Sequence, residues 1–406
     1  MYRPIAYHGR HADEDLCLSW GASMSESQQP AANPLRSVHT NNFPELLSKL
    51  GASLLVTTYQ AGKLVILRED GGLLNTHFRN LVKPMGLARD GGRLAVGCGI
   101  DIWEFHNVPV VCDKLDASDD YPNTSSKHDA CYLPRRSHCT GNVDVHEMAF
   151  VNSEIENAPN ELVFVNTQFS CLSKRSDENS FEPVWRPKWI KQIAPGDNCH
   201  LNGLATRDGQ AKYVTALGTS NKPGGWRENK RDGGLLLDVQ SHETIIKGLS
   251  MPHSPRWYNG QLWLLESGEG TIGTVDLRTG KYESIAQFPG FTRGLSFLGP
   301  LAFIGLSQVR ESATFSGIPL VERLEKAAER TCGVWVLNIE TGETVGFCRF
   351  EEGVQEIFAV DVLPGIRFPD LINHDAKIVG QSYVLSDAAL AEVPQELRDQ
   401  SHPQSS

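Results

Sequence analysis

The 406-residue sequence lacks long apolar runs, closely paired cysteines and an excess of positive charge. No stretch reaches the roughly 18 apolar residues of a membrane-spanning helix, and residues 1–20 carry charged side chains where a signal peptide would be apolar. The nine cysteines include no C-x-x-C pair, which argues against a zinc knuckle or a disulfide framework. The net charge of −11 argues against nucleic-acid and membrane partners. These absences predict a cytoplasmic protein.

Familiar catalytic signatures and helical periodicity are also scarce. The sequence contains no G-x-S-x-G, Walker A or H-E-x-x-H motif, and only residues 319–330 have a clear helical pattern. Short runs rich in Val, Ile, Leu, Phe and Tyr instead alternate with Gly, Asn and Asp turns, as in SLLVTTY, RLAVGCG and ELVFVNT. The sequence therefore predicts an all-β fold, with irregular ends at 1–38 and 392–406 around a single domain at 39–391.

One strand opening recurs six times along the chain. Its first position, the slot, is followed by a similar apolar pattern in every copy. The six slots are occupied by Met85, His146, Asn202, His253, Arg293 and Glu356. Successive slots are 40 to 63 residues apart, close to the length of a four-stranded propeller blade with insertions. We therefore expect a six-bladed β-propeller, whose last blade is completed by the strands at 53–70 because these have no opening of their own.

The slots of alternate blades hold His146, His253 and Glu356. In a propeller the innermost strands line a central channel, so these three side chains are expected to converge on its axis. Two imidazoles and one carboxylate are a ligand set for a metal ion that keeps open positions for water and substrate. The sequence predicts one divalent transition metal, with iron, zinc, manganese and copper not distinguished. The alternative is that each histidine is an ordinary core or rim residue.

Other polar residues near the slots have candidate roles. His200, two residues before Asn202, is expected to point the same way along the strand and to be an additional or replacement ligand. Asn202 and Arg293 are the candidate catalytic residues: Asn202 to orient a water or bind a cation, and Arg293 to bind a substrate carboxylate or phosphate. Arg293 pairing with Glu356 is the alternative. Strand alternation predicts that Glu147 faces away from the channel.

Two insertions, at 113–142 and 218–234, are long enough to cover one mouth of the channel. The second contains Trp226, which is the best candidate for an exposed aromatic at that mouth. Whether these segments form a lid or solvated loops stays open at this point.

The segments DVHEMAF, HLNGLATRDG, MPHSPRW, GFTRGLSF and VQEIFAVDVLPG resemble a family of uncharacterised bacterial proteins over roughly residues 40–385. More distantly, residues 202–209 are similar to blade openings of gluconolactonase, regucalcin and strictosidine-synthase-like six-bladed propellers. That resemblance implies an axial cation held by a Glu and by Asn or Asp residues. Only Asn202 and Glu356 correspond by type, and the histidines in two slots imply a softer metal than calcium and argue against lactonase activity.

These features predict a metal-dependent enzyme with a mononuclear site on the propeller axis. Its substrate is expected to be a small anionic metabolite or a modified peptide, and its reaction a hydrolysis or an oxidation, so that hydrolase and oxidoreductase both stay open. The alternative from another class is a non-catalytic propeller that binds a protein partner or senses a ligand.

Overall fold

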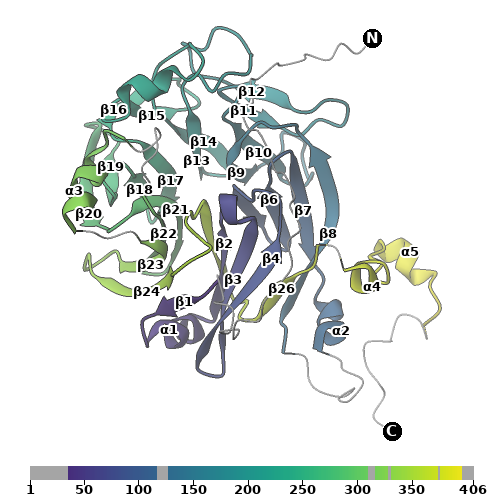
Figure 1. Ribbon diagram of the computed structural model, residues 1–406. Helices are drawn as coiled ribbons and strands as arrows, with labels where there is room; N and C mark the ends of the chain where they lie inside the picture. Colours follow the sequence, from purple (N-terminus) through teal and green to yellow (C-terminus); the bar gives the residue numbers. More distant parts are fainter. Residues whose placement is uncertain (1–34, 117–126, 310–315, 328–330, 374, 396–406) are drawn as a thin grey trace, which may run out of the picture. The chain divides into compact units, whose positions relative to one another are not determined.

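The computed structural model describes residues 35–116, 127–309, 316–327, 331–373 and 375–395, and these form six β-sheets arranged as a ring (Figure 1). The first three sheets are β5 (Leu87–Asp90), β6 (Arg93–Gly97), β7 (Asp101–Asn107) and β8 (Ala130–Cys139); β9 (Val145–Val151), β10 (Glu161–Asn166), β11 (Cys171–Lys174) and β12 (Glu182–Trp185); and β13 (Leu201–Arg207), β14 (Gln210–Ala216), β15 (Gly234–Asp238) and β16 (Thr244–Leu249).

The other three sheets complete the ring. They are β17 (Pro252–Tyr258), β18 (Gln261–Glu266), β19 (Thr271–Asp276) and β20 (Lys281–Gln287); β21 (Phe291–Leu298), β22 (Leu301–Ser307), β23 (Cys332–Asn338) and β24 (Thr344–Phe350); and β25 (Ala359–Pro364) with β2 (Ala52–Thr57), β3 (Lys63–Asp70) and β4 (Leu73–Asn80). The innermost strands β5, β9, β13, β17, β21 and β25 each contact the next, and β25 contacts β5. This confirms the predicted six-bladed propeller.

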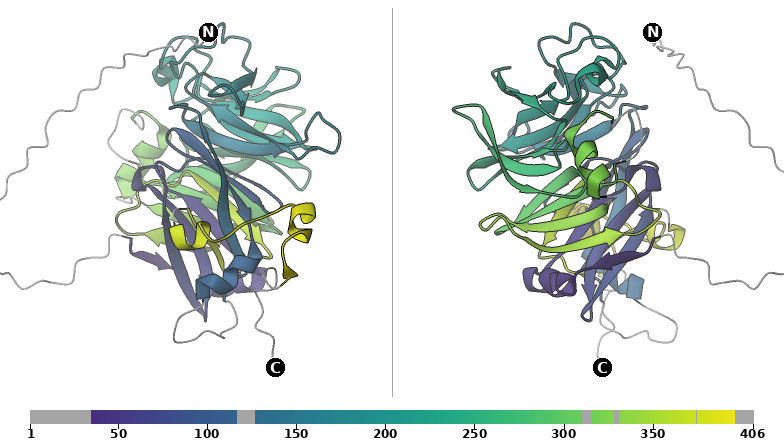
Figure 2. Two further views of the ribbon diagram at one scale, coloured as in Figure 1. Left: turned by 90° about the vertical axis from the view of Figure 1, so that its right-hand side faces the viewer. Right: turned by 60° about the vertical axis from the view of Figure 1, so that its left-hand side comes forward.

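The two ends of the propeller sequence close the ring together. Strand β2 pairs antiparallel with β25, with Leu54 opposite Val362 and Val56 opposite Val360, so the N-terminal strands complete the last blade as predicted. Two short strands add further closure: β1 (Ser37–His39) extends the β24 edge, and β26 (Pro369–Leu371) runs parallel to β8 (Figure 2). Neither was expected from the sequence, and β1 begins two residues before the predicted domain boundary at 39.

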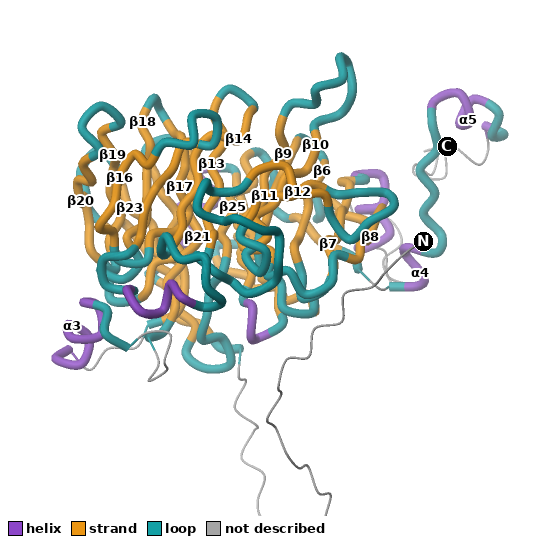
Figure 3. Tube along the Cα trace, turned by 90° about the horizontal axis from the view of Figure 1, so that it is seen from above, coloured by secondary structure: helices purple, strands orange, loops and turns teal. Residues whose placement is uncertain are grey.

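The remaining elements are short. They are α1 (Phe43–Leu50), η1 (Tyr59–Ala61), η2 (Pro109–Val111), α2 (Cys112–Asp116), η3 (Gly225–Asn229), α3 (Pro319–Ala327), α4 (Ala376–Val379) and α5 (Asp387–Ala391) (Figure 3). Helix α1 buries Phe43 and Leu47 against the apolar core shared by the β2 and β24 sheets. None of the helices in the described ranges is long and apolar enough to span a bilayer.

Local sequence explains the outer hairpins. Asp238, Asp276 and Asn338 each end the third strand of a blade, and each side-chain oxygen accepts hydrogen bonds from the backbone N–H groups two and three residues further on. This Asx turn reverses the chain toward the fourth strand.

Gly268, Gly270 and Gly273 have the G-x-G-x-x-G spacing of a dinucleotide-binding loop. In this protein the segment leads into the strand β19, whereas a dinucleotide site requires a helix at that point.

Every interface between neighbouring blades is bridged by a hydrogen bond near the start of an inner strand. Side chains donate five of these bonds, and the backbone N–H of Gly86 donates the sixth to Val145 O. The five side-chain bonds run from Thr57 to Met85 O, Thr167 to Leu201 O, Asn202 to Pro252 O, Ser267 to Thr292 O, and Ser307 to Ile357 O. We call this set the interblade bonds. They hold the inner strands in a common register around the channel.

The interblade bond of Ser307 can be tested by replacement with alanine. Its hydroxyl donates to Ile357 O at 3.0 Å and accepts from Ile357 N at 3.0 Å, so Ser307→Ala leaves two buried backbone groups without partners. We expect the free energy of unfolding to fall by about 1–3 kcal/mol in urea denaturation. Ser284→Ala, at an exposed position on β20, is the control. Equal effects of the two substitutions would show that the bond does not stabilise the interface.

Candidate functional site

Four of the six strand openings share a left-handed turn. The residue two positions before the slot has a positive φ in each: Lys83 (47°), Asp144 (51°), His200 (48°) and Met251 (48°). Non-glycine residues adopt this region only where surrounding contacts compensate the strain. The turn brings the carbonyl groups of Asp144 and Met251 to the rings of the histidines in the following slots.

His146 is the second residue of β9, and 8% of its surface is exposed. Its Nδ1 lies 3.1 Å from the carbonyl oxygen of Asp144 and 2.8 Å from Oγ1 of Thr167. Because Thr167 donates its own hydrogen to Leu201 O, both neighbours of Nδ1 act as acceptors. The hydrogen of neutral His146 is therefore on Nδ1, and Nε2 keeps its lone pair.

His253 has the same position on β17 and repeats this arrangement. Its Nδ1 lies 2.9 Å from Met251 O and 3.0 Å from Oγ of Ser267, which donates its hydrogen to Thr292 O at 2.5 Å. Nδ1 again carries the hydrogen, and Nε2 has no hydrogen-bond partner among the described residues. Thr167 and Ser267 follow the second strands of their blades directly, so an alignment extended to those strands would have revealed them.

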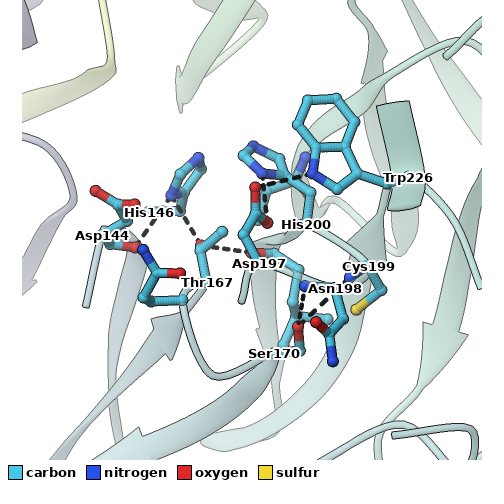
Figure 4. Close-up of polar contacts among 12 residues, drawn as sticks. Asp144, His146, Thr167, Ser170, Asp197, Asn198, Cys199, His200 and Trp226 are labelled. Atoms are coloured by element: carbon cyan, nitrogen blue, oxygen red, sulfur yellow. Dashed lines mark hydrogen bonds and ion pairs between the residues drawn. The ribbon is translucent and has the colours of Figure 1, made fainter. Parts of the chain in front are cut away.

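His200 lies beside His146 but is not part of a strand, because β13 begins at Leu201. The expectation that His200 points the same way along the strand as Asn202 is therefore wrong. His200 precedes the strand in the left-handed turn, and its Nδ1 lies 2.9 Å from Oδ1 of Asp197 (Figure 4). The ring centroids of His146 and His200 are 4.7 Å apart, and the rings are nearly perpendicular. Asp197 was not singled out from the sequence, because a lone carboxylate in a loop carries no recognisable pattern.

Trp226 covers His200 and is only 2% exposed, so the expectation of an exposed aromatic is wrong. Its ring centroid lies 4.4 Å from that of His200, and its Nε1 donates to Oδ2 of Asp197 at 2.8 Å. Residues 218–234, the Trp226 loop, therefore pack against the site. The other insertion, 113–142, contains part of α2 and all of β8, and its residues 117–126 lie outside the described ranges.

Arg293 is the cation of the site. Its guanidinium carbon lies 3.4 Å from the centroid of the Phe358 ring, whose centroid is 5.0 Å from that of His146. Part of the side chain is exposed, but Nη2 is buried, and Arg293 makes no hydrogen bond or ion pair with any residue in the described ranges. Burial lowers the pKa of Arg293 to about 10, and the negative charge of Glu356 partly offsets this effect.

Other predicted residues are occupied elsewhere. The amide of Asn202 accepts from Thr215 Oγ1 at 2.6 Å and donates to Pro252 O at 3.0 Å, so this side chain joins two blades. Glu356 precedes β25, and its charge raises the pKa of Arg293. Glu147 does not face away from the channel: it pairs with Arg256 of β17, and the β13 blade lies between their two blades, so the pair crosses the channel.

The predicted metal triad is not assembled in this arrangement. His146 and His253 lie at the mouth with their Nδ1 atoms engaged, but within the described ranges no group of three or more His, Cys, Asp and Glu side chains could hold a metal ion as it stands. The structure instead brings three imidazoles, one guanidinium and the Phe358 ring to a single mouth of the channel. The metal centre stays a prediction.

Residues 41–372 match the family described as Domain of unknown function (DUF4915), and the chain belongs to this family. This agrees with the resemblance to an uncharacterised propeller family, whereas the more distant likeness to gluconolactonase-type propellers finds no support in the comparisons. None of the curated proteins matches the chain.

Two solved structures align with most of the chain. A chain of a nidogen/laminin complex aligns with a TM-score of 0.47 and 9% sequence identity, covering 78% of this chain and 99% of that chain. A protein of unknown function from Bacteroides caccae aligns with a TM-score of 0.45 and 10% identity, covering 77% and 98%. At this level of similarity neither carries an argument about function.

The buried histidines predict a pH dependence of stability. Burial and the charge of Arg293 lower the pKa of His146 and of His253 well below the ordinary value. Below about pH 6.5 these rings therefore bind protons in the unfolded chain but not in the folded chain. The free energy of unfolding falls as the pH drops, by up to about 1.4 kcal/mol per pH unit for each ring.

Urea unfolding between pH 8 and pH 5 measures this effect. The double variant His146→Gln, His253→Gln should lose stability less steeply than the wild type over the acidic part of the range. His39→Gln, on the remote strand β1, is the control and should keep the wild-type slope. A double variant with an unchanged slope would contradict the assignment.

Proposed function

We propose that the protein is a hydrolase of a small anionic metabolite and that the mouth around Arg293, His146, His200 and His253 is its active site. The observation that carries this proposal is the guanidinium of Arg293, whose Nη2 is buried without a hydrogen-bond partner among the described residues. A partly buried cation without a hydrogen-bonded anion is costly, and a substrate carboxylate or phosphate would supply two acceptors in the geometry that a guanidinium fits best.

The histidines are proposed to transfer protons in the reaction. Each Nδ1 is held by an acceptor, so the three Nε2 atoms are the ones able to take a proton. His200 is the strongest candidate for the general base, because the Asp197 carboxylate orients its ring and stabilises the imidazolium that forms when it removes a proton from water. The activated water would then attack an ester, lactone or amide bond near the anionic group.

A metal-dependent reaction is the second candidate. Metal-ligating histidines usually donate their second ring nitrogen to a carbonyl or carboxylate, as all three do here. The imidazoles would have to move toward a common point, since the described side chains form no complete ligand group. Iron, zinc, manganese and copper all accept imidazole ligands, and an oxidative reaction would belong to this candidate only.

The distant gluconolactonase resemblance adds little to either candidate. It rests on Asn202, whose amide is committed on both atoms to contacts between blades. The ester bond of a lactone is therefore only one of several bonds that the activated water could attack.

Arg293→Gln tests the anion site. A panel of small carboxylates, hydroxy acids and phosphate monoesters should contain compounds that raise the unfolding temperature of the wild type, since a ligand at 100 times its Kd stabilises the folded state by about 2.7 kcal/mol. We expect the substitution to weaken binding of those compounds at least tenfold. Arg278→Gln, in an exposed turn after β19, should bind like the wild type. Unchanged binding by Arg293→Gln would overturn the proposal.

Metal analysis of the purified protein tests the second candidate. It predicts roughly one equivalent of a transition metal, and His146→Ala and His253→Ala should each lower this content sharply while the fold survives, because the blades supply the core. Full activity of metal-free protein would rule out the metal-dependent reaction. Absence of both metal and anion binding would favour the non-catalytic, partner-binding propeller.

A further inference from the structure

We infer that Asp197 couples the position of the Trp226 loop to the orientation of His200, so that the candidate general base is aligned only when the loop is closed. The inference rests on the proposed function for its catalytic meaning. Its structural basis is one carboxylate that serves two parts of the chain: Oδ1 accepts from His200 Nδ1 at 2.9 Å, and Oδ2 accepts from Trp226 Nε1 at 2.8 Å (Figure 4).

Asp197 itself is fixed by the scaffold. Its backbone N–H donates to Gln168 O at 3.0 Å, and the next two N–H groups, of Asn198 and Cys199, donate to Oγ of Ser170. Its φ of 48° places it in the left-handed region, which these contacts hold in place. The backbone of Asp197 is therefore anchored to residues 168–170, which lie between β10 and β11.

Glycines lie on both sides of Trp226 in its loop. Gly224 has a φ of 63°, and Gly218, Gly225 and Gly233 lie at close contacts that leave no room for a side chain without displacement. Such residues absorb backbone changes at the base of a closing loop. Its polar contacts with Asp197 are the Trp226 N–H and the Arg227 guanidinium, 3.4 Å from Oδ2, and the indole packs on His200. Trp226 also packs against Met251 and Phe291, and the Gly224 N–H donates to Gly196 O at 2.8 Å.

Opening of the loop would change the environment of His200 in two ways. The imidazole would lose the indole that covers one of its faces, and Asp197 would lose both donors that hold Oδ2. The carboxylate would then be free to rotate, and the Nδ1–H of His200 would no longer be directed by a fixed acceptor. Asp197 is thus a positioning residue, which acts on the reaction through His200.

Nitrogen-15 NMR of the histidine rings, without ligand, measures the coupling. In the wild type His200 should be the Nδ1–H tautomer. Asp197→Asn should shift part of the population to the Nε2–H tautomer and increase amide hydrogen exchange over residues 224–230 about tenfold. Trp226→Phe keeps the aromatic packing but removes the donor to Oδ2, and it should also change the His200 ring signals.

Arg231→Ala is the matched control. It removes the 2.9 Å ion pair between the loop and Glu322 of α3 without touching Asp197, so hydrogen exchange over residues 224–230 and the His200 signals should both stay as in the wild type. Unchanged His200 signals in Trp226→Phe would overturn the coupling, as would equal changes in Arg231→Ala. Because no ligand is used, failure of the coupling is distinguishable from failure of anion binding at Arg293.

Discussion

The hydrogen bonds between neighbouring inner strands are the constraint on which the rest of the structure depends. A propeller blade cannot bury its faces alone, so the ring is stable only when six blades keep a common height and angle about the axis. Hydroxyl groups such as Thr57 and Ser307 set that height by linking the second strand of one blade to the inner strand of the next. Apolar packing alone is non-directional and would not specify it.

The same bonds orient the histidines of two slots. Thr167 and Ser267 direct their hydrogens to the next blade, so their oxygens are left to accept from His146 and His253. The tautomers of the two rings thus follow from how the blades are joined. The pair between Glu147 of β9 and Arg256 of β17 adds an ionic contact between two blades that are not neighbours.

Electrostatics at the mouth favour a ligand that is negatively charged. The chain carries a net charge of −11, yet the candidate site presents a guanidinium and three imidazoles, and burial and the charge of Arg293 lower the pKa of two of these, His146 and His253. A neutral ring with a bare Nε2 accepts a proton, and a guanidinium on an aromatic face retains its charge. The hydrolysis that we propose would use both, at a site covered by Trp226.

The sequence by itself determined the architecture, because strand runs and their 40–63-residue repeat are local patterns that survive without knowledge of any contact. It also located the slots of His146, His253 and Arg293. Only the tertiary structure decided what these residues do. The role of His200 depends on a left-handed turn and on a carboxylate from a neighbouring loop, and the orientation of Glu147 depends on a partner two blades away. Such contacts join residues far apart in the chain, so no spacing or periodicity records them.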